Sequence, residues 1–249
     1  MHQGRCAVTK SGTLYGIGVG PGDPGLITVK GVNLLAQCRH IFVPKASMKA
    51  DSVALSIAGR YISSDAYIHE TVFSMTSDKE ELSRRWKEST HELIDILKTG
   101  EDACFLTLGD PFLYSTYIYL LRELRKSLPD VDVVTVPGIT AFSAVAALTG
   151  FPLGEGREPL TVIPAVDDLD DVRRSLAASG TVVLMKIGKR LGDILNILEE
   201  AGLIENAVFV SHAGMENQRI ETDLRRLKGE CREAGYLSTL IFHTKGGKG

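Results

Sequence analysis

Gly109-Asp110-Pro111 is the stretch in which residue types and spacing best suit ligand binding. The tripeptide ends an apolar run of strand length, residues 104–108, and a segment with helical spacing begins just beyond it. In an alternating α/β protein, ligands bind in the loops at the carboxyl ends of parallel strands, and Gly109 lets a ligand approach the backbone closely. Gly, Asp and Pro are also the standard residues of an ordinary turn, so these residues alone leave both interpretations open.

A second glycine-rich loop, residues 20–25, follows the first apolar run of the chain. Its spacing satisfies the G-x-G-x-x-G pattern of dinucleotide sites. We reject that interpretation because Pro21 and Pro24 lack the N–H groups that hold a pyrophosphate, and Asp23 repels phosphate. The glycines instead favour a bulky neutral or cationic ligand lying flat against the backbone, with Asp23 as acceptor. A helix that starts with Pro24 at its first position is the structural alternative.

Two more sites lie at the ends of predicted strands. Lys45 follows the short apolar run 41–43, which places it on the rim that binds ligands, although most lysines are simply exposed to solvent. Thr140 and Ala141 follow the strand predicted at 131–136, at the start of a helix rich in small residues. Small side chains there favour a ligand packed against the helix start, or close packing of the helix on the sheet.

Strand-length apolar runs alternate with helical patterns along the chain, which indicates an α/β fold. In the first half we expect strands at 13–20, 41–43, 66–71, 104–108 and 131–136, and helices at 26–38, 52–61, 78–98, 114–128 and 142–148. In the second half we expect strands at 160–164, 181–187, 207–211 and 238–243, and helices near 168–178, 191–201 and 222–228. The Gly/Pro-rich, charged segment 150–159 is typical of a linker, so we predict an N-terminal α/β domain at 13–150 and a C-terminal α/β domain at 157–249.

Composition excludes several classes of protein. The chain has 249 residues, 44% hydrophobic and 24% charged, which is typical of a globular protein with one large or two moderate cores. Its 28 basic and 31 acidic residues give a net charge of −3, so no basic field favours nucleic acid. The four cysteines form no CxxC pair, so neither a metal site nor a disulfide framework is predicted. No apolar run approaches the roughly 20 residues that span a bilayer, and residues 1–12 lack a signal-peptide core, so we expect a soluble cytoplasmic protein without a membrane partner.

Three ordered motifs resemble the tetrapyrrole methylase family. They are Gly-Val-Gly-Pro-Gly-Asp-Pro at 18–24, Leu-Gly-Asp-Pro-x-x-Tyr-Ser-Thr at 108–116 and Val-Pro-Gly-Ile-Thr-Ala at 136–141. Within that family, Phe-Val-Pro-Lys at 42–45 and the segment 69–78 resemble members that methylate carbon 20 of precorrin-2. The resemblance covers nearly the whole chain, from Leu14 to Phe242.

This resemblance implies two α/β domains with the active site in the cleft between them, and a homodimer. It implies an enzyme that uses S-adenosylmethionine to methylate precorrin-2, with or without cobalt, in cobalamin biosynthesis. Methylation of another ring carbon of a corrin precursor, and a non-enzymatic S-adenosylmethionine sensor, are the alternatives.

The resemblance also implies which residues meet the ligands. The cofactor-binding positions that it transfers to this sequence are Pro21, Gly109, Asp110, Leu113, Ser115, Thr116, Thr140, Ala141, Met185, Ala213, Ser238 and Thr239. For the substrate it implies Lys45, Asp23 and Thr76, with Lys45 meeting a ring carboxylate. Methyl transfer needs positioned reactants more than a strong base, so no catalytic residue is assigned. Asp23, His69 and Glu70 are candidates to accept the proton that leaves the ring.

Overall fold

The computed structural model describes residues 10–45, 47, 49–72, 79–164, 168–228, 235 and 237–244. The chain divides into two compact units, Met1–Ile139 and Thr140–Gly249. The domain limits expected from the sequence give helix α5 (Ala141–Thr149) to the first domain. In the structure α5 belongs to the second unit, where it packs against β8 (Ala207–Ser211) and β10 (Ser238–His243). The segment 150–159 therefore runs within the second unit.

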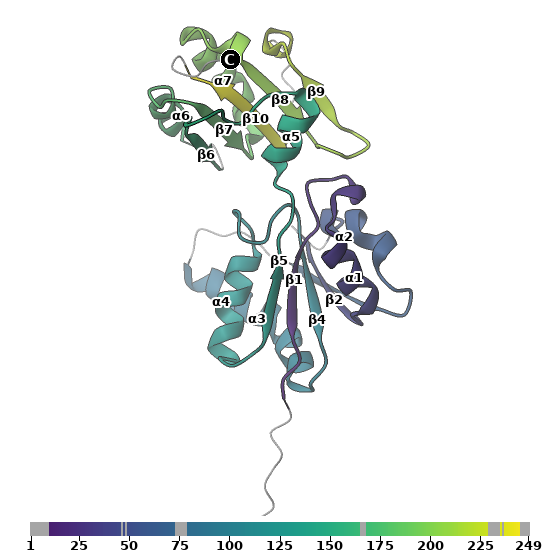
Figure 1. Ribbon diagram of the computed structural model, residues 1–249. Helices are drawn as coiled ribbons and strands as arrows, with labels where there is room; N and C mark the ends of the chain where they lie inside the picture. The colour runs from purple at the N-terminus through teal and green to yellow at the C-terminus, as the bar shows by residue number, and fades with distance from the viewer. Residues whose placement is uncertain are drawn as a thin grey trace, which may run out of the picture. The chain divides into compact units, whose positions relative to one another are not determined.

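The first unit is built on a five-stranded sheet with the strand order β3-β2-β4-β1-β5 (Figure 1). Its strands are β1 (Leu14–Gly18), β2 (His40–Lys45), β3 (Tyr67–Val72), β4 (Ala103–Thr107) and β5 (Val133–Val136). All neighbouring strands run parallel, which confirms the predicted fold class. The central strand β4 is buried at every position, as its unbroken apolar run requires.

Helices cover both faces of this sheet (Figure 1). They are α1 (Val29–Gln37), α2 (Val53–Ala58), α3 (Lys79–Lys98) and α4 (Tyr117–Ser127). Ile17 of β1 lies against Gly31 of α1, whereas Phe105 of β4 packs with Tyr117 of α4 on the opposite face. The connections that follow β1 and β4 thus leave the sheet on opposite faces. The adjacent carboxyl ends of β1 and β4 therefore form the topological switch point, where ligands bind in folds of this kind.

Hydroxyl side chains determine where three of the helices begin. Thr28, Ser52 and Thr140 are the N-caps of α1, α2 and α5, and each accepts a hydrogen bond from the backbone N–H three residues on. Ser77, three residues before Glu80 as in a capping box, is the N-cap that the sequence predicts for α3, and it lies outside the described residues.

The second unit contains a mixed sheet with the strand order β6-β7-β10-β8-β9. The strands introduced here are β6 (Leu160–Ile163), β7 (Thr181–Met185) and β9 (Arg219–Glu221). Strand β10 is antiparallel to both β7 and β8, so β7 and β8 end at the edge where β10 begins. Sequence patterns missed β9, because three residues are too few to show alternation. The helix expected at 222–228 is wrong, since only a 3-10 helix, Leu224–Leu227, forms there.

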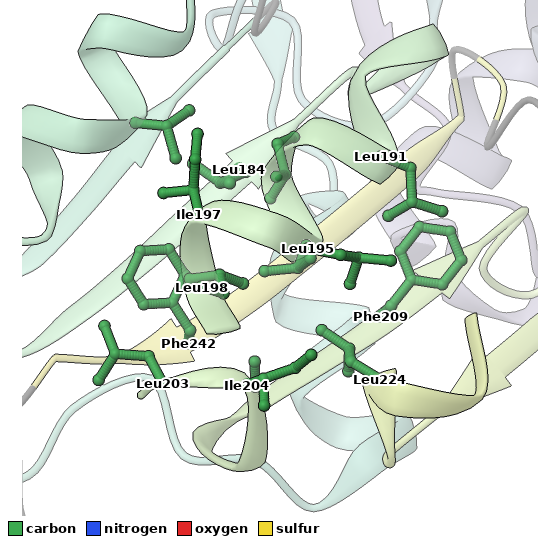
Figure 2. Close-up of a cluster of buried hydrophobic side chains, with 14 of the residues drawn as sticks. Leu184, Leu191, Leu195, Ile197, Leu198, Leu203, Ile204, Phe209, Leu224 and Phe242 are labelled. Carbon is green, nitrogen blue, oxygen red and sulfur yellow. The ribbon is translucent and has the colours of Figure 1, made fainter. Parts of the chain in front are cut away.

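The core of the second unit lies between this sheet and helix α7 (Leu191–Glu200) (Figure 2). Leu195 and Leu198 of α7 pack with Phe209 of β8 and Phe242 of β10, and all four side chains are buried. Full burial of such a side chain contributes roughly 1.5–3 kcal/mol to stability. The short helix α6 (Leu169–Ser175) adds Val172 to the same cluster.

Within the described residues, no helix has both the length and the apolar character needed to cross a membrane. Cys38 and Cys104 are buried free thiols, whereas Cys6 and Cys231 lie outside the described residues. The described part of the chain also holds no group of three or more His, Cys, Asp or Glu side chains placed to bind a metal ion.

Candidate active site

The two glycine-rich loops meet at the switch point through their backbones. The N–H of Gly109 donates to the carbonyl of Gly20 at 2.8 Å, and the N–H of Gly20 donates back to the carbonyl of Gly109 at 3.4 Å. Both residues have positive φ angles, 78° for Gly20 and 69° for Gly109, which glycine adopts at little cost. Two loops that are 89 residues apart by their numbering in the sequence therefore form one backbone element.

The backbones of three glycines approach one another closely at this point and leave no room for a side chain between them. These glycines are Gly18, Gly109 and Gly138. A Cβ atom at Gly138 would lie 2.0 Å from the Gly109 carbonyl oxygen and 2.8 Å from Gly18 Cα. A Cβ atom at Gly109 itself would meet nothing closer than the carbonyl oxygen of Ile139 at 4.0 Å. Gly18 and Gly138 thus serve backbone packing, whereas Gly109 leaves space beside the backbone that a ligand can use.

Asp110 fixes the shape of the central loop. Its Oδ1 accepts a hydrogen bond from Phe112 N at 2.8 Å, and its Oδ2 accepts one from Gly138 N at 3.1 Å. Each carboxylate oxygen therefore holds a backbone N–H, so the side chain ties the loop after β4 to the loop after β5.

The central loop passes into α4 through three consecutive residues with hydroxyl groups. Tyr114 has a φ of 51°, which is strained for a non-glycine residue. Ser115 is buried, and its hydroxyl accepts from Tyr117 N at 3.0 Å. Thr116 stands at the N-cap of α4 without a side-chain cap bond. The Tyr117 hydroxyl lies 2.9 Å from Thr135 Oγ1, and burial raises the pKa of this tyrosine. The structure thus brings together the first-unit residues expected to bind the cofactor, which are Pro21, Gly109, Asp110, Leu113, Ser115 and Thr116.

The second-unit residues expected to bind the cofactor share one edge of their own sheet. Met185 of β7 and Thr239 of β10 are register partners. Ser238 pairs with Ser211 at the end of β8, and Ala213 follows two residues later. These residues, scattered in the sequence, lie at the edge where β7 and β8 end and β10 begins.

Two residues at this edge were missed by the sequence analysis. Lys186 directly follows β7 with a φ of 58°, and His212 directly follows β8 with a φ of 52°. Their N–H groups donate to the carbonyls of Ser238 and Leu237, at 3.0 and 2.8 Å. A left-handed backbone in non-glycine residues is costly and concentrates at functional sites. Histidine is enriched in this conformation but not confined to it, and lysine gives no signal for it, so the sequence alone does not identify these two positions.

Thr140 and Ala141 begin helix α5. Thr140 Oγ1 accepts from Ser143 N at 3.4 Å and lies 2.8 Å from Ser143 Oγ. The hydroxyl expected at the cofactor thus also caps the helix.

Comparison with known proteins agrees with this architecture. Residues 13–228 match the sequence pattern of the family described as tetrapyrrole (corrin/porphyrin) methylases. The chain belongs to this family. It is 32% identical to a cobalt-precorrin-2 C(20)-methyltransferase from Salmonella typhimurium, over 94% of this chain and 97% of that protein. It is 30% identical to a precorrin-2 C(20)-methyltransferase from a Sinorhizobium species, over 92% of this chain and 94% of that protein.

Solved structures of other methyltransferases share the fold of this methylase. A cobalt-precorrin-4 methyltransferase, CbiF, aligns with a TM-score of 0.67 at 23% identity, over 93% of this chain and 94% of that chain. A uroporphyrin-III C-methyltransferase from Thermus thermophilus, solved with S-adenosyl homocysteine, aligns with a TM-score of 0.63 at 20% identity, over 93% and 92% of the two chains.

Lys45 of the methylase lies at the carboxyl end of β2, as predicted, but it is already paired. Its Nζ lies 2.9 Å from Glu70 Oε2, and its side chain is only 10% exposed, against 53% for Glu70. Lys45 is therefore not the ordinary solvated lysine of the alternative interpretation. A substrate carboxylate has to share this ammonium group with Glu70 or replace Glu70.

Asp23 has a structural role, because a helix starts with Pro24 at its first position, which was the alternative interpretation of this loop. Its Oδ1 accepts from Gly25 N at 2.7 Å and caps a 3-10 helix, Pro24–Leu26. Its side chain remains exposed at the first glycine loop. Thr76, the other residue expected at the substrate, lies outside the described residues.

His69 belongs to a chain of four hydrogen-bonded side chains. Its Nε2 lies 3.0 Å from His40 Nδ1 and its Nδ1 lies 2.8 Å from Glu92 Oε1, while His40 Nε2 lies 2.5 Å from Glu101 Oε2. His40 is the first residue of β2, so this chain of contacts starts at the end of the strand opposite Lys45. These hydrogen bonds give His69 a structural role, and they lie away from the switch point between β1 and β4.

Proposed function

We propose that this methylase transfers a methyl group from S-adenosylmethionine to carbon 20 of precorrin-2, or of its cobalt form, in cobalamin biosynthesis. The observation that carries the proposal is the 32% identity, over 94% of the chain, to an enzyme named for that reaction. The two relatives carry names for the cobalt form and for the metal-free form, so the proposal includes both substrates.

We assign the methyl donor to the positions that the family resemblance transfers to this sequence. The proposed residues are Pro21, Gly109, Asp110, Leu113, Ser115, Thr116, Thr140, Ala141, Met185, Ala213, Ser238 and Thr239. The space beside Gly109 fits a ligand pressed against the backbone, and Asp110 holds that loop in one shape. S-adenosylmethionine supplies an electrophilic methyl group on a sulfonium. The protein's own contribution is to hold the two reactants in line, which lowers the barrier by fixing orientation before the reaction.

The substrate carries its own nucleophile, an electron-rich ring carbon, so the protein does not need to generate one. Its remaining tasks are to bind the acidic side chains of the ring and to exclude water. We assign Lys45 to one of the ring carboxylates, because its ammonium group is sheltered at a strand's carboxyl end. Asp23 and Thr76 complete the proposed substrate contacts. With a net charge of −3, recognition has to come from such placed cations and not from a general field.

The proposal includes a homodimer, which the family resemblance implies, and a cytoplasmic location. Size-exclusion chromatography with light scattering tests the dimer, since a monomer at assay concentration contradicts it.

Anaerobic incubation with methyl-labelled S-adenosylmethionine and precorrin-2, with and without cobalt, tests the reaction. We expect one added methyl group, placed at carbon 20 by mass and carbon-position analysis. Label at another ring carbon would identify a different methylase. Donor binding without transfer to either form of the ring would favour the sensor alternative.

A further inference from the structure

Thr107 is the last residue of β4 and sits at the switch point, opposite Gly18 in the register of β1. Thr107 is 4% exposed. Among the described residues, its hydroxyl is the one buried side-chain oxygen or nitrogen without a hydrogen-bond partner. It lies two positions before Gly109, so it borders the candidate cofactor loop.

The hydroxyl of Thr107 finds no hydrogen-bond partner on the described structural elements around it. The alternation of β4 places Thr107 on the same face as Phe105, which is the face covered by α4. The neighbour on β1 is Gly18, which has no side chain. On the other side, the pairing of β2 with β4 ends at Phe42 and Phe105, before Thr107 is reached.

A hydroxyl at this position is hard to explain by packing. Valine has nearly the same shape, suits a buried strand better and leaves no polar group unpaired, whereas an unpaired buried hydroxyl is costly. Two other buried threonines do have partners: Thr181 Oγ1 lies 3.0 Å from His243 Nδ1, and Thr244 Oγ1 donates to the Gly180 carbonyl at 3.1 Å. An orphaned polar group beside a glycine crossing indicates a partner that arrives from outside the chain.

We propose that Thr107 is a further ligand-contacting residue of the methylase, whose hydroxyl donates a hydrogen bond to a carboxylate of a reactant bound at the switch point. This inference rests on the proposed function, because S-adenosylmethionine and the tetrapyrrole both carry carboxylates. A hydroxyl bond to a charged acceptor is stronger than one to a neutral acceptor, which offsets the cost of keeping the hydroxyl unpaired in the free protein.

The test compares Thr107→Val, Thr107→Ser and, as a matched control, Thr181→Val, in which a buried threonine loses an existing partner. Without ligand, Thr107→Val raises the melting temperature by about 2 °C or more, because it removes an unpaired polar group, whereas Thr181→Val lowers it. With both reactants present, Thr107→Val lowers kcat/KM about tenfold or more, and Thr107→Ser retains most of it.

Calorimetry with S-adenosylhomocysteine and the KM of the tetrapyrrole identify which reactant supplies the carboxylate. Weaker S-adenosylhomocysteine binding in Thr107→Val points to the donor, and a raised tetrapyrrole KM with unchanged S-adenosylhomocysteine affinity points to the ring. A melting temperature lowered as in Thr181→Val overturns the proposal, since the hydroxyl then has a partner in the free protein, such as a buried water. Unchanged affinity for both reactants overturns it as well. If the wild-type protein transfers no methyl group, the proposed function fails, while the melting temperatures and S-adenosylhomocysteine affinities still test Thr107.

Discussion

The carboxylate of Asp110 accepts a hydrogen bond from the backbone N–H of Gly138, 28 residues further along the chain, at 3.1 Å. Its other oxygen holds the N–H of Phe112 at 2.8 Å. One side chain thus keeps the loops after β4 and β5 in a fixed relation, and the carbonyl of Gly109 lies where these loops cross. The loop expected to hold the cofactor is therefore preorganised by the protein itself.

We expect Asp110→Asn to lower the free energy of unfolding by about 1–3 kcal/mol, because a single amide oxygen cannot serve both N–H groups. Urea unfolding measures this loss. Asp168→Asn is the matched control, since Asp168 Oδ1 holds one N–H, that of Asp170 at 2.8 Å, and asparagine caps helices equally well. Equal losses in the two variants would mean that the bridge to Gly138 adds nothing.

The glycine crossing predicts a large difference between two Gly→Ala substitutions. In Gly138→Ala the new methyl group would lie 2.0 Å from the Gly109 carbonyl oxygen, so we expect a loss of about 3 kcal/mol or more, or failure to fold. In Gly59→Ala nothing lies within 4 Å and the φ of −53° suits alanine, so we expect a gain of about 0.4–1 kcal/mol. Thermal unfolding of both variants checks this, and a stable Gly138→Ala protein would contradict the close approach.

The sequence predicted most of the strands and helices along the chain, because buried parallel strands such as β4 give unbroken apolar runs. It also located the loops at Gly20 and Gly109, since glycine and proline mark turns directly. It could not show that the two loops bond to each other, because tertiary pairing leaves no local pattern. For the same reason the pairing of Lys45 with Glu70, the left-handed backbone of Lys186 and His212, and the unpaired hydroxyl of Thr107 became visible only in the structure.

Alanine substitutions at Gly109 and Gly150 distinguish the effect of backbone strain from the effect of ligand contact. Both have positive φ, 69° and 67°, and in both the space around a Cβ atom is open to 4.0 Å or more. We expect Gly109→Ala and Gly150→Ala each to cost about 1–2 kcal/mol of stability. Only Gly109→Ala should weaken S-adenosylhomocysteine binding, by tenfold or more, in calorimetry. Equal affinities in the two variants would remove Gly109 from the cofactor site. Alanine is the better test than valine here, because a β-branched residue at this φ adds strain of its own.

His243 predicts part of the pH dependence of stability. It is 5% exposed, lies 3.0 Å from Thr181 Oγ1 through its Nδ1 and stacks on Phe151, and burial lowers its pKa, with Glu158 opposing the shift. The unfolded chain therefore binds this proton more readily than the folded protein. Its contribution to stability is present above the ordinary histidine pKa of about 6.5 and is lost as the pH falls below that value.

We expect the urea concentration at the unfolding midpoint of the wild-type protein to decrease as the pH is lowered from 7.5 to 5.5. In His243→Gln the decrease should be smaller. A wild-type and a variant protein with the same pH dependence would show that His243 does not titrate differently on folding.

Separate substitutions of Lys45 and of its partner Glu70 test substrate binding more sharply than either substitution alone. The Lys45 side chain is 10% exposed, and its Nζ lies 2.9 Å from Glu70 Oε2. If Lys45 binds a ring carboxylate, Glu70 competes with the substrate for the same ammonium group. Lys45→Ala should then raise the KM of the tetrapyrrole about tenfold or more, since a sheltered charge-assisted bond contributes roughly 1.5–3 kcal/mol. Glu70→Gln should lower the same KM, because it removes the competing carboxylate and leaves the lysine in place.

The KM of S-adenosylmethionine serves as the internal control in both variants and should stay unchanged. The effect of Lys45→Ala should shrink at higher salt, because screening weakens wild-type binding first. A purely structural ion pair predicts a different result: both substitutions would lower stability, and neither would move the KM of the ring. That outcome would remove Lys45 from the substrate site, whereas opposite shifts in the two variants would identify Glu70 as the residue that occupies the ammonium group until the substrate arrives.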